Sequence, residues 1–344
     1  MINLYGKTMS QLAELMVQEG QKTYRAKQLF TWIYEKKAKS FDEMSDISKS
    51  FRDVLKEKYC LDKPSIYVKQ VASDGTIKLL VEFKDKSKVE TVLMRYNYGN
   101  VACVSSQVGC NMGCSFCASG LLKKKRNLLP EEMVGEVLVL NDLLEEEGQK
   151  VTHVVVMGTG EPFDNYDNVI DFVRIINDQK ALAIGARHIT VSTCGIPSKI
   201  IRYGKEGLQI NLAISLHAPN NELRTKLMKI NKAHPLEELI PAIKEYIDLA
   251  GRRVTYEYIL IKGVNDSLEH ARELIELIKP TFAYVNLIPC NPVVEKGYDR
   301  PDSATIHAFM DYCIKHGVNT TIRKEFGTDI DAACGQLRAK HNEE

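Results

Sequence analysis

The chain has 344 residues and a formal net charge of +1, with 44% of its residues hydrophobic and 26% charged. This balance is typical of an ordinary globular protein and excludes a strongly basic nucleic-acid binder, so only local patches of charge would contact RNA. No apolar run of about 18 residues predicts a membrane helix, and the amino terminus lacks a signal-peptide core. Nine cysteines in such a chain indicate metal or catalytic chemistry in the cytoplasm.

Residues 1–62 are predicted to form a small helical domain. Leu12, Leu15 and Met16 recur at helical spacing, and so do the apolar residues between positions 26 and 33. Basic side chains are spread over the same region: Lys22, Arg25, Lys27, Lys36, Lys37 and Lys39. Such charges usually only solvate exposed helix faces, but a small basic helical domain would also suit RNA docking.

Between residues 63 and 96 the hydrophobic period changes to two, which is typical of strands. The runs 66–68, 78–83 and 89–94 alternate in this way, and Ser73-Asp74-Gly75 predicts a turn between the first two. We therefore expect a short antiparallel β extension. Glu90 lies among apolar neighbours in the last run, where a single carboxylate is usually at the surface or paired.

Residues 97–322 alternate between strand and helix patterns. Strands are predicted at 101–105, 151–157, 188–192, 210–215, 254–261 and 284–288, with helices near 130–146, 166–178, 197–204, 235–250, 267–278 and 303–316. This alternation implies parallel strands joined by right-handed crossovers. Six units without an obvious seventh or eighth predict an α/β fold, a partial (β/α)6 barrel of TIM-like form.

A loop after the first barrel strand holds Cys110, Cys114 and Cys117 in a C-x3-C-x2-C spacing. Gly109 and Gly113 would let its backbone turn tightly. Three thiolates on one loop could ligate three irons of a [4Fe–4S] cluster and leave the fourth iron open for a further ligand. A zinc site or a chance group of buried thiols is the alternative, although structural zinc sites usually take two ligand pairs and no second pair is evident.

The carboxyl ends of barrel strands, where barrel enzymes place their chemistry, lead into small and polar residues. These residues are Gly158, Gly160, Glu161, Ser192, Ser215, Leu216, His217 and Asn291. Glycines allow the backbone to approach a bound amino acid, and Glu161 could accept a hydrogen bond from its ammonium group. A Gly-x-Gly pair by itself is nevertheless a weak signal, and a single histidine such as His217 is more often structural than catalytic.

The carboxyl-terminal segment 327–337 reads GTDIDAACGQL, and its Cys334 alone would be interpreted as an inert buried thiol. Together with the cysteine loop, this segment resembles the RlmN/Cfr family of radical S-adenosylmethionine (SAM) methyltransferases. The resemblance covers nearly the whole chain and includes residues 89–92, 103–107, 125–128, 211–219 and 263–266. It implies one [4Fe–4S] cluster and SAM as cofactors, and a tail over residues 323–344 that carries a catalytic cysteine.

The resemblance also implies a mechanism. Cys334 would take a methyl group from one SAM, and a second SAM would yield a 5′-deoxyadenosyl radical that removes hydrogen from this S-methyl group. The resulting methylene radical would add to an adenine carbon. Glu90 would accept a proton there, and Cys103 would release the product by forming a transient disulfide with Cys334. The residues implied to hold cofactors are Cys110, Cys114 and Cys117 for the cluster and Gly160, Glu161, Ser192, Ser215, Leu216, His217 and Asn291 for SAM.

Two subfamilies share this mechanism. RlmN-type enzymes methylate C2 of an adenosine in 23S ribosomal RNA, and some also methylate an adenosine in tRNA, whereas Cfr-type enzymes methylate C8 of the same ribosomal nucleotide and confer antibiotic resistance. Pro162 and the segment 211–219 favour the RlmN type, while Thr159 and Ser119 depart from the commoner residues and Phe326-Gly327 also occurs in Cfr-like chains.

The implied partners are 23S ribosomal RNA and tRNA, with an electron donor such as flavodoxin or ferredoxin, and we expect a monomer. A different hypothesis is a non-catalytic iron–sulfur or zinc module that binds RNA. That hypothesis would explain the cysteine loop and the basic run 123–126 but not Cys103 or Cys334. The remaining cysteines match no motif and are predicted to be structural: Cys60, Cys194, Cys290 and Cys313.

Overall fold

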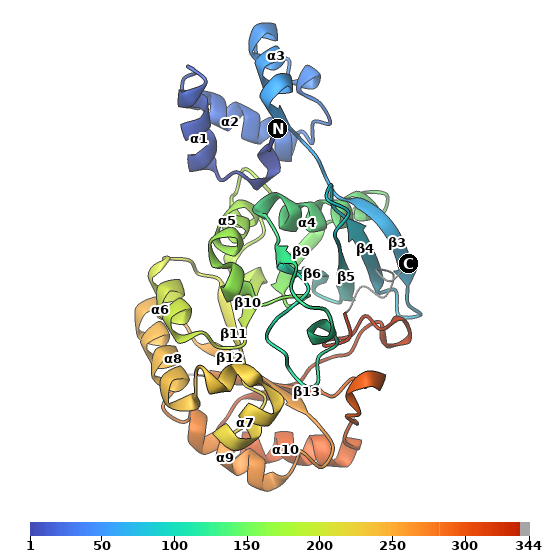
Figure 1. Ribbon diagram of the computed structural model, residues 1–344, viewed down its shortest axis with the longest axis vertical. Coiled ribbons are helices and arrows are strands. Elements are labelled where there is room, and N and C mark those ends of the chain that lie inside the picture. Colours follow the sequence, from blue (N-terminus) through green and yellow to red (C-terminus); the bar gives the residue numbers. More distant parts are fainter. Residues whose placement is uncertain (282, 338–344) are drawn as a thin grey trace.

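A computed structural model describes residues 1–281 and 283–337. Figure 1 shows a small group of amino-terminal helices set apart from a larger body that is built on one sheet. Within the described residues this sheet has ten strands in the order β14-β13-β12-β11-β10-β9-β6-β5-β4-β3. No helix in these two stretches is long and apolar enough to cross a membrane.

The amino-terminal group is helical, as predicted for residues 1–62. Their bounds are Met9–Gln18 for α1, Tyr24–Phe30 for α2 and Lys49–Lys58 for α3. Thr8 and Gln11 form a capping box that starts α1, which satisfies two otherwise unpaired backbone N–H groups. Two short parallel strands, β1 (Ile2–Asn3) and β2 (Tyr59–Cys60), join the two ends of this group.

The predicted antiparallel strands are confirmed, but they do not form a separate sheet. They are β3 (Ser65–Val71), β4 (Ile77–Glu82) and β5 (Lys88–Tyr96). β5 pairs antiparallel with β6 (Gly99–Cys103), the first barrel strand, after a tight turn. The β extension therefore continues the barrel sheet, and residues of β4 and β5 lie beside the first barrel strand.

The partial (β/α)6 barrel is confirmed, and a short strand β14 after the sixth helix adds a further parallel neighbour. After β6 the parallel strands are β9 (Val151–Val156), β10 (Ile189–Thr193), β11 (Asn211–Ser215), β12 (Val254–Leu260), β13 (Ala283–Pro289) and β14 (Thr320–Ile322). The predicted helices are α4 (Pro130–Glu145), α5 (Tyr166–Asn177), α6 (Pro197–Lys205), α8 (Leu236–Ala250), α9 (Leu268–Ile278) and α10 (Ser303–Lys315). The sequence patterns did not predict α7 (Asn221–Leu227) or the pair of short strands β7 (Gln107–Val108) and β8 (Arg126–Asn127).

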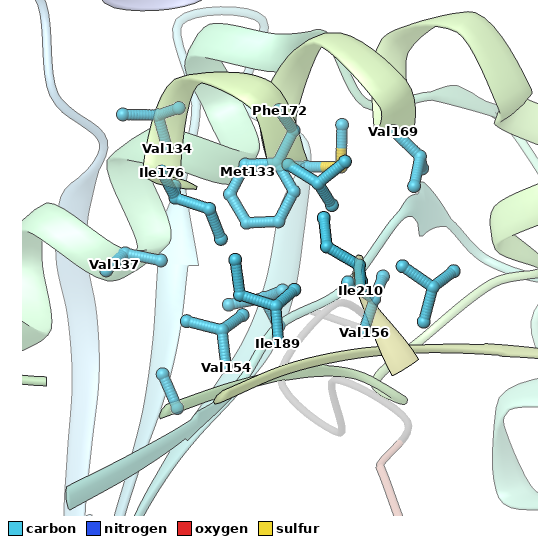
Figure 2. Close-up of a cluster of buried hydrophobic side chains, with 14 of the residues drawn as sticks. Met133, Val134, Val137, Val154, Val156, Val169, Phe172, Ile176, Ile189 and Ile210 are labelled. Atoms are coloured by element: carbon cyan, nitrogen blue, oxygen red, sulfur yellow. The ribbon is translucent and has the colours of Figure 1, made fainter. Parts of the chain in front are cut away.

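Figure 2 shows the apolar layer that lies between the sheet and the helices α4 and α5. Met133 of α4 and Phe172 of α5 are fully buried there with Val154 of β9 and Ile189 of β10. Side chains alternate across a strand, so Val155 lies on the opposite face of β9, where it packs in a cluster with Cys103 rather than in this layer. The apolar layer thus leaves the inner face of the barrel free for chemistry.

Candidate active site

The cysteine loop follows β6 and is fixed by its own backbone. The amide of Cys110 donates to the carbonyl of Leu122 at 3.0 Å, and the amide of Ser115 donates to the carbonyl of Leu227 at 2.8 Å. Gly109 has a φ of +77°, and a Cβ there would overlap the backbone of Lys123, so the turn requires glycine. The predicted role of this glycine in shaping the loop is confirmed.

The three cysteines of the loop line one cavity, which we call the cysteine cavity; Glu161, Ser192 and His217 also line it. Burial raises the pKa of Cys110 to about 11 and also raises the pKa of the Cys114 and Cys117 thiols. A positively charged group would be needed to hold all three as thiolates. Three thiols that line one cavity match the three cysteine ligands of a [4Fe–4S] cluster with one open iron.

The glycine-rich turn after β9 packs directly on the segment that follows β6. The amide of Gly158 donates to the carbonyl of Val104 at 3.0 Å, and the carbonyl of Thr159 accepts from the amide of Ser106 at 2.8 Å. Gly160 has a φ of +114°, and a Cβ there would lie 2.6 Å from the Ser106 hydroxyl oxygen. The sequence Gly-x-Gly therefore serves close backbone packing at the cavity wall.

Glu161 is 3% exposed, and both of its carboxylate oxygens already accept hydrogen bonds from the protein. Oε1 accepts from the Thr193 hydroxyl at 2.6 Å and from the Phe163 amide at 2.9 Å, and Oε2 accepts from the Cys194 amide at 2.7 Å. Burial raises the pKa of this carboxyl while these hydrogen bonds oppose the rise. The contacts fix the orientation of the carboxylate, and each oxygen has further lone-pair capacity for a bound ammonium group.

Ser192 and Ser215 end the neighbouring strands β10 and β11, and their hydroxyl oxygens lie 3.4 Å apart on the cavity wall. The Nδ1 atom of His217 accepts from the Ile259 amide at 3.0 Å, which places the ring proton on Nε2. Burial, with Arg224 nearby, lowers the pKa of His217 to about 3, so its ring is neutral. Leu216 lies in the apolar core away from the cavity, so only its backbone is available to a ligand.

The tail places Cys334 at the wall between the cysteine cavity and a second one, which we call the tail cavity; Cys103, Phe326 and Ala333 also line the tail cavity. The side-chain amide of Asn291 donates to the Cys334 carbonyl at 3.1 Å, and the backbone amide of Ala118 donates to the Gly335 carbonyl at 2.8 Å. Asn291, which the resemblance implies as a SAM contact, therefore holds the backbone of Cys334. The tail is described as far as Leu337, and residues 338–344 of the predicted segment lie outside the described residues.

Cys103 and Glu90 lie on the inner face of neighbouring strands. Cys103 of β6 pairs with Val92 of β5, two residues from Glu90. Burial raises the pKa of the Cys103 thiol to about 12, and Cys334 adds to the rise. The structure therefore brings Cys103 and Cys334 to one cavity. Glu90 lies on the adjacent strand, two residues from the partner of Cys103 and on the same face of the sheet.

Sequence reasoning missed two charged residues at this site, Glu257 and Arg323, which both line the cysteine cavity. Glu257 Oε2 accepts from the side-chain amide of Asn286 at 2.9 Å and lies 3.7 Å from Arg323 Nη1. The electrostatic interaction with Cys334 raises the pKa of Arg323, burial opposes this, and Glu257 adds to the rise. Glu257 is the one charged residue in a run of apolar and aromatic residues at 254–261, and that was the signal that could have identified it.

Comparison with known proteins extends these observations. Residues 104–278 match the model of the radical SAM superfamily, and residues 2–61 match the ribosomal RNA large subunit methyltransferase N-terminal domain. The chain is 53% identical to a probable dual-specificity RNA methyltransferase RlmN of Enterococcus faecalis over 98% of the chain and 96% of that protein. It is 52% identical to the protein of the same name in Geobacillus kaustophilus, over 99% of the chain and 94% of the relative. The crystal structure of a radical SAM methyltransferase from Sphaerobacter thermophilus is 42% identical with a TM-score of 0.92, over 98% and 99% of the two chains.

The radical SAM superfamily uses a [4Fe–4S] cluster and SAM, so this protein uses both cofactors. The likeness extends through the amino-terminal helices, the barrel and the tail, and does not stop at the superfamily core. The Cfr-type alternative is not favoured, because the relatives matched along the full length carry the other name. The chain belongs to the RlmN family of radical SAM RNA methyltransferases.

Proposed function

We propose that the protein methylates C2 of a specific adenosine in 23S ribosomal RNA and of an adenosine in tRNA. The printed name of its relatives, dual-specificity RNA methyltransferase, supports two kinds of RNA substrate. The observation that carries the mechanism is the place of Cys334 in the wall shared by both cavities. A sulfur in that position can exchange groups with a cofactor on one side and with Cys103 on the other.

In this proposal Cys110, Cys114 and Cys117 ligate the cluster, and the polar rim of the cysteine cavity binds SAM. The rim offers the Ser192 and Ser215 hydroxyls and the glycine-rich turn before Glu161. When bound, the two cofactors supply a methyl group and a 5′-deoxyadenosyl radical. The fixed backbone of the loop and turn would orient them, because closely packed positions such as Gly160 leave little freedom to move.

Cys334 carries the methyl group. Its sulfur takes a methyl group from SAM and loses its own proton, and the S-methyl group, after losing one hydrogen atom, bonds to C2 of the adenine. Release begins when Glu90 takes the proton from C2 and the adduct gives up the unpaired electron left by the radical addition, for which the cluster would be the acceptor. The Cys103 sulfur then attacks the Cys334 sulfur and loses its proton, while the sulfur–carbon bond breaks and its electron pair remains on the methylene carbon, which is protonated to methyl. A thiol reductant must reduce the resulting disulfide before the next turnover.

Further parts of the proposal concern the surroundings of the enzyme. We infer a cytoplasmic monomer that receives electrons from a flavodoxin or ferredoxin. Exposed Lys22, Lys27 and Lys39 in the amino-terminal domain would contact the RNA phosphates. The match of this region to a ribosomal RNA methyltransferase domain supports that assignment.

Nucleoside mass analysis tests the proposal. Anaerobically reconstituted protein is given unmodified ribosomal RNA or tRNA and SAM with a CD3 group, and the product is digested to nucleosides. We expect 2-methyladenosine that keeps two of the three deuterium atoms, because one is removed before the bond to C2 forms. The product 8-methyladenosine would overturn the C2 assignment, and no methyladenosine despite an intact cluster would reject the RNA substrates.

A further inference from the structure

The tail that carries Cys334 is held by the hairpin between β3 and β4. The Asp74 carboxylate accepts from the Gly327 amide at 2.9 Å, and the Asp329 carboxylate accepts from the Ser73 amide at 2.9 Å. Gly327 has a φ of +58°, and a Cβ there would lie 2.7 Å from the Cβ of Ala332. The β extension and the tail therefore meet closely over residues 73–76 and 327–332.

Lys78 of β4 is the buried end of this contact. Its ammonium group donates to the carbonyls of Ile330 and Asp331. The same group lies 3.4 Å from Glu90 Oε1, and the Lys78 and Glu90 side chains are each 7% exposed. One cation thus contacts both the carboxylate proposed as the base and the segment that leads to Cys334.

Strand register explains how these groups meet. Lys78 of β4 pairs with Val92 of β5, and Val92 pairs with Cys103 of β6. Glu90 lies two residues before Val92, on the same face of the sheet. Lys78, Glu90 and Cys103 therefore form one patch of the inner face, and the tail covers it. Removing one partner of such a buried ion pair is strongly destabilising for the other.

We propose that Lys78 is a positioning residue that holds Glu90 and the Cys334 tail in place relative to each other. One side chain would then serve both the methylation of Cys334 and the release of the product. This inference rests on the proposed function, because it assigns Glu90 and Cys334 the roles given above. The tail carbonyls that Lys78 contacts precede Cys334 by four and three residues. Asp331 at this point has a left-handed φ of +51°, so a shift of these carbonyls would move the turn that presents Cys334.

The test separates the two effects of Lys78 with matched variants. Lys78→Met keeps the aliphatic chain and removes the charge, Asp329→Asn weakens only the tail contact, and Glu90→Gln removes the base while the Lys78 side chain stays in place to contact the tail. Lys86→Met is the control, because Lys86 is an exposed lysine of the next turn that pairs with Glu82. Each protein is assayed for cluster content, SAM cleavage, methylation of Cys334 by intact mass, and covalent protein–RNA adduct.

We expect Lys78→Met to retain the cluster and SAM cleavage, to methylate Cys334 about 10- to 100-fold more slowly, as expected for a displaced reacting group, and to accumulate the protein–RNA adduct. Asp329→Asn should show only slow methylation, Glu90→Gln only the adduct, and Lys78→Arg should recover most of both. Lys78→Met that behaves like the Lys86 control, or that shows only one of the two defects, would overturn the inference. If the wild type itself forms no 2-methyladenosine, the proposed function has failed instead. If Lys78→Met does not retain the cluster, Lys78→Gln is tested instead. It is judged by the same two defects, slow methylation of Cys334 and accumulation of the protein–RNA adduct.

Discussion

The two halves of the single sheet hold different parts of the chemistry. In the parallel half, from β6 to β14, strand ends and the cysteine loop surround the cysteine cavity. In the antiparallel half, β4 and β5 carry Lys78 and Glu90 and hold the tail. Cys103 lies at the junction, since it pairs with Val92 on one side and Val155 on the other. We infer that the parallel half binds the cofactors, and that the antiparallel half places the methyl carrier together with Asn291 and the end of the cysteine loop.

The two halves also stabilise buried charge in different ways. Glu161, in the parallel half, accepts hydrogen bonds from backbone amides and a hydroxyl at the ends of neighbouring strands. Glu90, in the antiparallel half, lies against the ammonium group of Lys78, which also contacts the tail. Hydrogen bonds within one rigid wall depend little on the tail, whereas the Lys78 contacts depend on the tail being in place. Substitutions in the two halves should therefore affect different steps.

The largest effect should come from removing the methyl carrier. Cys334→Ala should reduce methyl transfer to RNA by about a thousandfold or more, because the sulfur that forms the covalent bond is lost. SAM cleavage should persist, since the parallel half is unchanged. Parallel assays of 5′-deoxyadenosine and methyladenosine check this. Cys313→Ala, in a buried cysteine of α10, is the matched control and should retain both activities. Methyladenosine made at the control rate by Cys334→Ala would contradict the role of Cys334 as the methyl carrier.

The parallel half was predictable from sequence to a greater extent than the antiparallel half. Hydrophobic periodicity located the six predicted strands and helices of the barrel within a few residues, because each strand–helix unit buries its apolar face locally. Cys110, Cys114 and Cys117 could also be placed together from the sequence, because they lie on one short loop. The short helix α7 was missed because seven residues carry too little periodic pattern.

Contacts between distant segments could not be predicted. Lys78 and Ile330 are 252 residues apart, and no local pattern in either segment indicates that they meet. Glu257 and Arg323 likewise come from β12 and the segment after β14, and the sheet order brings them together. The family resemblance identified Cys334 and Cys103 as site residues, but it did not indicate any role for Lys78. Side chains that act through tertiary contact thus required the structure.

A smaller effect, confined to the parallel half, is expected from Gly160→Ala. The added Cβ would meet the Ser106 hydroxyl oxygen at 2.6 Å and the Gln107 Cβ at 2.7 Å at a φ of +114°. Strain of about 1–3 kcal/mol should weaken SAM binding by about 10- to 100-fold. SAM cleavage and RNA methylation should fall together at low SAM, and titration of SAM measures the change. Gly148→Ala is the control, because its φ is also positive at +66° but no atom lies within 4 Å of the added Cβ. Equal SAM affinity in both variants would show that the turn does not shape the site.

The smallest expected effect is on stability, and it concerns Glu136 of α4, which packs behind the strand that joins the two halves of the sheet. Glu136 of α4 is fully buried; its Oε2 accepts from the Ser105 amide at 3.0 Å, and its Oε1 has no hydrogen-bond partner within the described residues. Burial raises the pKa of this carboxyl well above 4.5.

Its contribution to stability is therefore complete below the unfolded pKa and is lost as the pH rises toward the folded pKa, because the unfolded chain releases the proton first. Glu136→Gln removes this titration. The variant should gain stability relative to the wild type as the pH rises, by at most about 1.4 kcal/mol per pH unit within that window, with RNA methylation unchanged. Thermal unfolding of both proteins from about pH 5.5 to about pH 8.5 measures the difference in Tm, which should reach about 2 °C or more. A difference in Tm that does not change with pH would mean that this carboxyl keeps its ordinary pKa in the folded protein and is ionised behind the junction.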